Sequence, residues 1–173
     1  MREAWLVAAM VFVAALLQSA IFSSLMILGG TPDLLLVTLL GISLLRGSVT
    51  GALAGFLGGL VLDVANLGTL GVTSLLLTLA GYWTGRYGET TGRDRAHAPF
   101  LAVVVLTVLV AVGGLLLHYM LGEDVSARHA LLQTLIPTLA LNLIIAAPVF
   151  ALCRRILRPL DRPQRAQEVR LIV

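Results

Sequence analysis

Twelve arginines are placed along this chain in a way that fits one alternating membrane topology. The 173 residues contain no lysine, and long apolar runs separate the arginines. If these runs cross a bilayer six times with the N-terminus inside, the cytoplasmic segments hold eleven arginines and only Arg128 lies outside. Cytoplasmic loops of membrane proteins carry an excess of basic residues. The sequence therefore predicts a multi-pass membrane protein with both termini in the cytoplasm.

The composition supports a membrane protein and argues against a soluble one. Apolar residues make up 58% of the chain, charged residues make up 12%, and the mean hydropathy is +0.98. A soluble domain of this length could not bury so much apolar surface. The basic charge lies in the predicted inner loops and tail, where it meets anionic lipid headgroups, so nucleic acid is not expected as a partner.

Six apolar runs predict an all-α bundle of six transmembrane helices in residues 1–153, followed by a basic cytoplasmic tail, 154–173. The predicted helices are 4–28, 32–45, 48–64, 72–85, 99–121 and 130–153. The first run is too long for a signal peptide and is interpreted as a retained helix. The second to fourth helices are short for a hydrocarbon core of about 30 Å, so residues 34–64 could alternatively form a re-entrant pair. The arginine placement favours full crossings.

Glycines recur every fourth residue in the third predicted helix, at positions 47, 51, 55 and 59. This spacing places Gly51, Gly55 and Gly59 on one face, and Gly58 widens it. Small residues at this spacing allow close approach of a neighbouring helix. The neighbour is either another helix of the same bundle or a helix of a partner protein, and the sequence leaves both open.

Two aspartates mark the predicted outer ends of helices. Asp63 extends the glycine face toward the outer surface, where it is expected either to contact a partner or to hold the outer loops, for example by accepting amides at a helix start. In Thr31-Pro32-Asp33, threonine is the expected cap and proline the first helical residue. Arg46, at the other end of that helix, is expected to extend toward the inner surface.

Nothing in the sequence suggests an active site. The histidines His97, His118 and His129 lack the spacing of a metal pair, and Cys153 stands alone, so no metal or cofactor is expected. Gln18 and Asn142 are the polar groups expected at depth. Each is interpreted as a hydrogen-bonding bridge between helices rather than a ligand contact.

Several segments resemble the rod shape-determining protein MreD family of bacterial cell-wall elongation. They are Pro32-Asp33-Leu34-Leu35, Gly51 with Gly55-Phe56-Leu57-Gly58-Gly59-Leu60 and Asp63, and Leu67-Gly68 through Gly71 to Leu79-Ala80-Gly81-Tyr82. The length, the six-helix hydropathy and the basic C-terminal tail also agree with this family.

The resemblance implies a non-enzymatic scaffold of the inner membrane that takes part in peptidoglycan synthesis and cell-shape control. Its implied partners are the bitopic scaffold MreC, and also MreB, RodA and a class B penicillin-binding protein. It further implies the fold of substrate-binding S-components of energy-coupling-factor transporters. The alternative function is therefore the substrate-binding membrane subunit of a transporter for a vitamin-type solute. Pro32, Asp33, Gly51, Gly55, Gly58, Gly59, Asp63 and Gly71 are the candidate residues for partner binding or packing.

Overall fold

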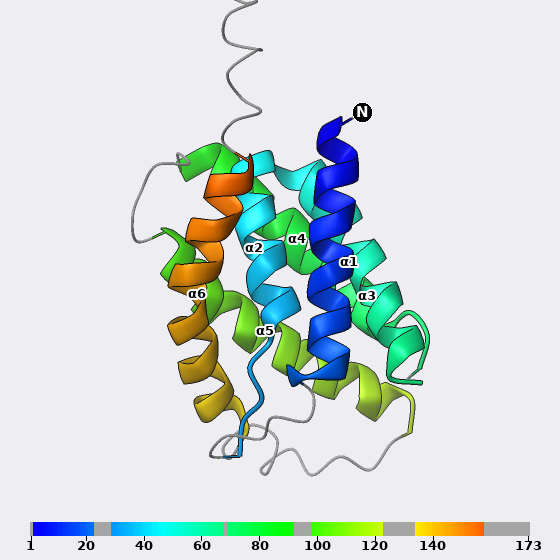
Figure 1. Cartoon of the computed structure of the whole chain (residues 1–173). Coiled ribbons are helices and arrows are strands. Elements are labelled where there is room, and N and C mark those ends of the chain that lie inside the picture. Colours follow the sequence, from blue (N-terminus) through cyan, green and yellow to red (C-terminus); the bar gives the residue numbers. More distant parts are fainter. Residues whose placement is uncertain (1, 23–28, 68, 92–97, 123–133, 158–173) are drawn as a thin grey trace, which may run out of the picture.

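The computed structural model describes residues 2–22, 29–67, 69–91, 98–122 and 134–157. Within these ranges the chain forms six helices (Figure 1). They are α1 (Arg2–Ala20), α2 (Leu34–Arg46), α3 (Ser48–Ala65), α4 (Val72–Thr91), α5 (Ala98–Met120) and α6 (Leu135–Leu157). The predicted all-α class is confirmed.

Successive helices run in opposite directions, so each end of the bundle gathers alternate helix ends. Arg46, Arg86, Arg154 and Arg155 lie toward the end where α1 begins and α6 finishes, which we call the arginine-rich end (Figure 1). Asp33 and Asp63 lie toward the opposite end, which we call the aspartate end. This segregation agrees with the charge asymmetry expected from the sequence.

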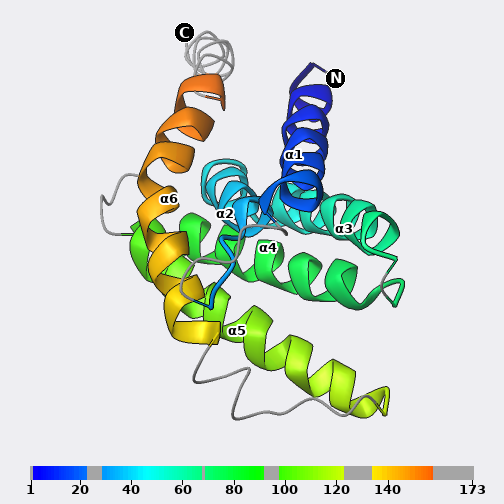
Figure 2. The same cartoon turned by 60° about the horizontal axis from the view of Figure 1, so that its bottom comes forward.

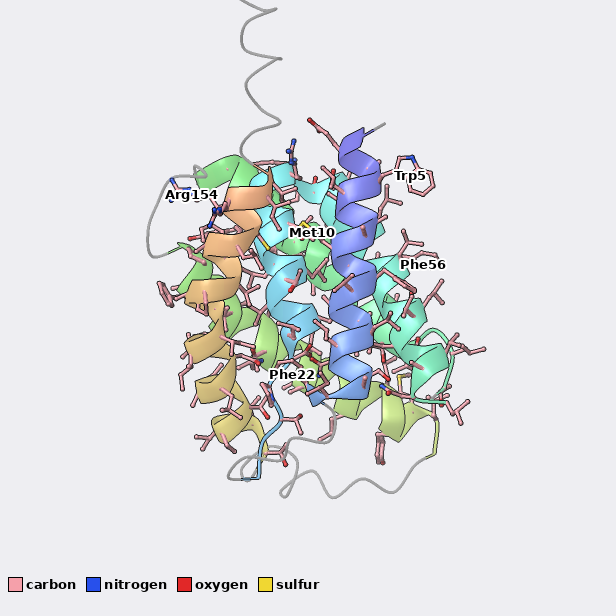
Figure 3. The ribbon with its side chains drawn as sticks, in the orientation of Figure 1. Trp5, Met10, Phe22, Phe56 and Arg154 are labelled. Atoms are coloured by element: carbon pink, nitrogen blue, oxygen red, sulfur yellow. The ribbon has the colours of Figure 1, made fainter. Side chains whose placement is uncertain are left out.

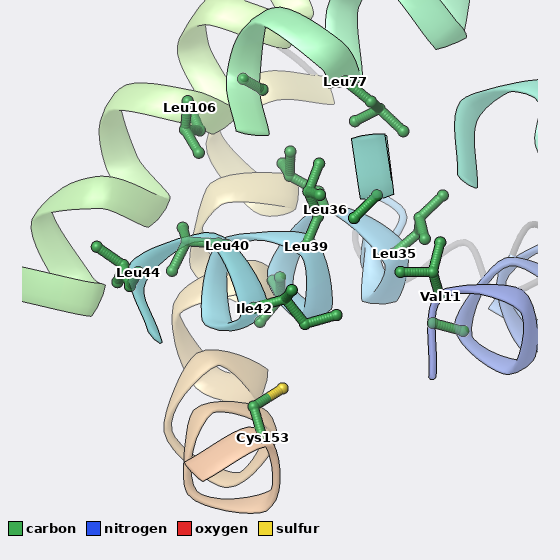
Figure 4. Close-up of a cluster of buried hydrophobic side chains, with 14 of the residues drawn as sticks. Val11, Leu35, Leu36, Leu39, Leu40, Ile42, Leu44, Leu77, Leu106 and Cys153 are labelled. Carbon is green, nitrogen blue, oxygen red and sulfur yellow. The ribbon is translucent and has the colours of Figure 1, made fainter. Parts of the chain in front are cut away.

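Helix α2 lies at the centre and contacts the five other described helices. Ten of its thirteen residues are buried, because it is apolar on every side (Figure 4). Leu35, Leu39 and Ile42 are at most 1% exposed. Figure 2 shows α2 between α1 and α6, and Figure 1 shows α4 behind it. A helix of 13 residues is only about 20 Å long, and the surrounding helices shield it from lipid.

The outer surface of the bundle is apolar, as a membrane environment requires. Trp5 and Phe56 project away from the helices, whereas Met10 points toward α2 (Figure 3). Four helices are long and apolar enough to cross a bilayer, namely α1, α3, α5 and α6. Helix α2 is shorter, and α4 carries Arg86 and Glu89 in its last turns.

The largest differences from the predicted helix boundaries are at the ends of α1, α4 and α6. Helix α4 extends to Thr91, six residues beyond its predicted end at 85. Its last turns continue because Glu89 and Gly88 pack against the start of α3 and the end of α2. Helix α6 ends at Leu157 rather than at 153, so Arg154 and Arg155, assigned to the tail, form its last turn. Helix α1 ends at Ala20, and residues 23–28 and 130–133 of the predicted helices lie outside the described residues.

Candidate functional site

The most closely packed part of the molecule is the pair formed by α3 and α4, which share the largest contact between helices. Gly51, Gly55 and Gly59 face α4 along three turns. A Cβ atom built on Gly55 would collide with the carbonyl oxygen of Leu77, and one on Gly59 would lie 2.6 Å from the amide nitrogen of Ser74. These approaches involve backbone atoms, so a side chain cannot be accommodated by a change of rotamer. The glycines therefore allow backbone-to-backbone contact within the bundle.

Helix α4 contributes its own glycines to this contact. A Cβ atom on Gly81 would collide with the backbone of Gly51, and one on Gly85 with the backbone of Ser48. Gly85 was not among the predicted residues. The signal was present, because Gly81 and Gly85 are four residues apart, but two glycines alone do not identify the helix that they face.

The other predicted glycines have different surroundings. Gly58 faces α1 and α2, where an added Cβ would lie 2.8 Å from Cγ1 of Val11 and 3.1 Å from Cδ1 of Leu35. Gly71 precedes α4 with φ of +96° and open space around its Cα. Glycine is favoured there because a positive φ strains other residues. Thus Gly58 serves packing and Gly71 serves the turn.

Asp63 holds the start of α4. Its side chain is buried, at 4% exposure, and accepts three backbone amides: Oδ2 from Gly71 at 2.8 Å and Ser74 at 3.3 Å, and Oδ1 from Thr73 at 3.2 Å. The first amides of a helix have no intrahelical acceptors, and a negative charge near them is favourable. The structure thus matches the interpretation in which Asp63 holds the outer loop, with the amides at a helix start as its partners.

Glu89 makes the equivalent contact at the arginine-rich end. Its Oε1 accepts the amide of Ser48 at 2.8 Å and the Ser48 hydroxyl at 3.0 Å, while Arg86 donates to Oε2 at 3.3 Å. The Ser48 amide bond, followed by the Ser48 hydroxyl and Arg86, lowers the pKa of Glu89 below its ordinary value. Helices α3 and α4 therefore cap each other's first turns. Glu89 was not predicted from the sequence, because its partner Ser48 is 41 residues away.

The start of α2 is held by side chains from two other helices. Asp33 is the cap, and its Oδ1 accepts the amide of Leu36 at 2.9 Å. The expectation that Thr31 caps the helix is wrong, since the Asp33 carboxylate reaches that amide and the helix begins at Leu34 after Pro32. Gln18 of α1 accepts the amide of Leu34 at 2.7 Å through Oε1 and donates to the carbonyl of Pro32 at 3.1 Å.

Asn142 completes this polar node from α6. Its Oδ1 accepts the Asp33 amide at 2.7 Å, and its Nδ2 donates to the hydroxyl of Thr107 in α5 at 3.2 Å. Asn142 is fully buried. The predicted role of Gln18 and Asn142 as hydrogen-bonding bridges between helices is confirmed.

Arg46 joins three helices at the arginine-rich end. Nη1 pairs with Glu3 of α1 at 3.0 Å, and Nη2 donates to the carbonyl of Leu157 in α6 at 2.9 Å. Its side chain is only 10% exposed. Its partners lie at the arginine-rich end, where α1 begins and α6 finishes, so the expected direction of Arg46 stays a prediction while its partners are additional to it.

The polar groups described above are engaged in holding helices together. Cys153 is buried against Gly41, as expected for a small apolar side chain. Among the described residues, no group of three or more acidic, histidine or cysteine side chains could hold a metal ion. His97 and His129 lie outside the described residues. The candidate site is thus a set of helix-to-helix contacts, and its geometry suits a rigid membrane body.

Comparisons with known proteins agree with this picture. The family model described as rod shape-determining protein MreD matches residues 2–159. The cell shape-determining protein MreD of Streptococcus pneumoniae (strain ATCC BAA-255 / R6) is 34% identical over 88 residues, which are 50% of this chain and 53% of that protein. The match thus spans about half the length of this curated relative. No solved structure matches the chain significantly.

Proposed function

Because the chain belongs to the MreD family of rod shape-determining proteins, and so has a role in cell-shape determination, we propose that it acts as a non-enzymatic scaffold in the bacterial inner membrane. In this proposal it positions proteins of the cell-wall elongation machinery and performs no chemistry of its own. The observation that carries it is that polar side chains within the bundle hold helices together. Asp63, Gln18 and Asn142 each bond to another helix or to the amides that begin one.

The proposed partners are MreC first, and then MreB, RodA and a class B penicillin-binding protein. The glycine face of α3 was one candidate surface for a partner's helix. That face is covered by α4, whose backbone contacts Gly51, Gly55 and Gly59. Partner contacts are therefore expected on the outward faces of the helices or on the loops, and the glycine face supports the scaffold by making it rigid.

We further propose that all six helices cross the membrane, with both termini in the cytoplasm. The gathering of Arg46, Arg86, Arg154 and Arg155 toward one end supports this orientation. Single cysteines at Leu70 and Thr90, both exposed, test it in a Cys153→Ala background. A membrane-impermeant thiol reagent added to whole cells should label position 70 and spare position 90. Labelling of both from outside, or of position 90 alone, contradicts the orientation.

The alternative function is a solute-binding subunit with the S-component fold. Such a site gathers several convergent polar groups in a pocket. In the described residues, the polar groups at the aspartate end serve as caps and bridges instead, which favours the scaffold.

A gentle-detergent purification of the tagged protein from its own host membranes separates the two functions. Mass spectrometry of the co-purified proteins should find a bitopic periplasmic scaffold together with a cell-wall synthase. The same purification from host membranes that lack the tagged protein controls for non-specific recovery of membrane proteins. Recovery of a coupling membrane subunit with paired ATPases would contradict the scaffold and support the solute-binding subunit.

A further inference from the structure

A groove runs between α4 and α5 toward the arginine-rich end and is not used by the contacts described above. Its volume is about 300 Å³. Its floor is formed by Thr84, Ala102 and Leu106, which are buried, and the walls are large side chains that face outward. The lining residues are Trp83, Thr84, Tyr87, Leu101, Ala102, Val105, Leu106 and Leu109. The groove opens on the surface that faces the membrane.

The size of the groove limits what can occupy it. One turn of an α-helix with its side chains occupies about 400–600 Å³, given a diameter of 10–12 Å and a pitch of 5.4 Å. The groove is therefore too small to enclose a partner's transmembrane helix. From Leu101 to Leu109 the groove follows α5 for about 12 Å. A narrow apolar channel of this length suits part of a lipid acyl chain.

The aromatic residues place the groove relative to the membrane surface. Tryptophan and tyrosine concentrate where hydrocarbon meets headgroups. Trp83 is 61% exposed, and its ring meets the ring of Tyr82 edge-on with centroids 5.8 Å apart. Tyr87, one turn farther toward the arginine-rich end, also lines the groove. One end of the groove thus lies near the headgroups, and Leu106 and Leu109 lie deeper.

Positive charge is found at the headgroup end. Arg86 follows Trp83 by three residues, and its side chain is 53% exposed. Its Nη1 contacts Glu89, whose other carboxylate oxygen is held by Ser48, so the acidic group is directed toward the start of α3. Helix α5 begins at Ala98, and the partial positive charge of its first turn lies next to Leu101. A phosphate group would complement the guanidinium and this helix start.

We propose that the groove holds one acyl chain of an anionic phospholipid whose phosphate lies between Arg86 and the first turn of α5. The chain enters at the level of Trp83 and packs on Ala102 and Leu106. This lipid site is independent of the proposed scaffold function, since it requires only that the helices lie in a membrane.

Native mass spectrometry of the full-length protein in a mild detergent tests the proposal. Phosphatidylglycerol and phosphatidylethanolamine with identical acyl chains are added at equal concentration. Phosphatidylglycerol should be retained about fivefold more, which is the gain expected from one arginine near an anionic headgroup. Equal retention of the two lipids would contradict headgroup recognition.

Matched variants locate the site. Val105→Trp narrows the groove from its wall, and its control is Leu152→Trp on α6, because the two positions are equally exposed, at 54% and 55%. Arg86→Gln removes the charge, and Arg155→Gln, also exposed, is its control. Retention of phosphatidylglycerol should fall about fivefold in Arg86→Gln, should also fall in Val105→Trp, and should stay unchanged in both controls. Unchanged retention in Val105→Trp would overturn the groove as the site.

A photoreactive phosphatidylglycerol with a diazirine in its acyl chain tests the wild-type protein directly, so the result does not depend on the folding of a variant. Labelled peptides should map to the α5 segment from Leu101 to Leu109. Labels spread evenly over the outward helix faces would overturn the proposal. Exclusion of the label from this segment by a co-purified protein would assign the groove to a protein partner instead.

Discussion

Replacing Gly55 by alanine should destabilise the protein, although alanine is the better helix former. A Cβ atom at this position would meet the carbonyl oxygen of Leu77 at less than 3.0 Å, whereas ordinary contact begins at 3.4 Å. The two helices would have to part by about 1 Å. The helix-propensity gain is about 1 kcal/mol, and overpacking costs about 1–3 kcal/mol. Parting α3 from α4 also lengthens the bonds to Glu89 and those to Asp63, whose cap is worth about 1 kcal/mol.

The sum is a net loss of about 2 kcal/mol, which corresponds to about 4–8 °C in melting temperature for a chain of this size. Gly114→Ala is the matched control, because its Cβ would meet only the Cδ1 atom of Leu76, at an ordinary 3.7 Å. Thermal unfolding in detergent, followed by tryptophan fluorescence, measures both. If Gly55→Ala melts at or above the wild-type temperature, the backbone contact inferred between α3 and α4 is refuted.

Three further changes test the polar contacts. Asp63→Ala should lower the free energy of unfolding by about 2 kcal/mol, because three amides at the start of α4 lose their acceptor. Those amides should then exchange their hydrogens with solvent faster than in the wild type. Unaltered hydrogen exchange would contradict the cap. Asn142→Leu should lower the free energy of unfolding by about 1–3 kcal/mol, because it leaves the Asp33 amide and the buried Thr107 hydroxyl unpaired; thermal unfolding at the wild-type temperature would argue against the node. Because folding lowers the pKa of Glu89, its contact with Ser48 stabilises the protein above pH 4.5, and this stabilisation is lost as the pH falls through the lower pKa of the folded state. The melting temperature of Glu89→Gln should therefore depend less on pH between pH 3 and 6 than that of the wild type. An unchanged dependence on pH would contradict the role assigned to Glu89.

The sequence predicted the class and the helices because the membrane makes hydropathy and charge strongly informative. Continuous apolar runs and one-sided arginines identified six helices and the segregation of charge toward one end. The same logic identified Gln18 and Asn142, because a polar side chain in an apolar helix needs a partner on another helix. The close contact made by Gly51, Gly55 and Gly59 was likewise evident from their spacing.

The parts that could not be predicted depend on which helices are neighbours. Spacing indicated a smooth face on α3, but only the fold shows that α4 covers it with Gly81 and Gly85. Glu89 looked like an ordinary loop charge, since Ser48 lies far away in sequence. The partners of Arg46 could not be predicted for the same reason, because Glu3 and the Leu157 carbonyl lie at the ends of α1 and α6, far away in sequence.

The α3 and α4 pair differs from the α4 and α5 pair in a way that bears on function. On one side, α4 contacts α3 by backbone atoms and is fixed at both ends by Asp63 and Glu89. On its other side, α4 and α5 leave the groove that Trp83 lines. Lipid tails are as apolar as the helices, so association in the membrane depends on close packing rather than on hydrophobic burial. The unfilled side of α4 is therefore where a lipid can bind without breaking existing contacts, while α3 keeps α4 in a fixed position.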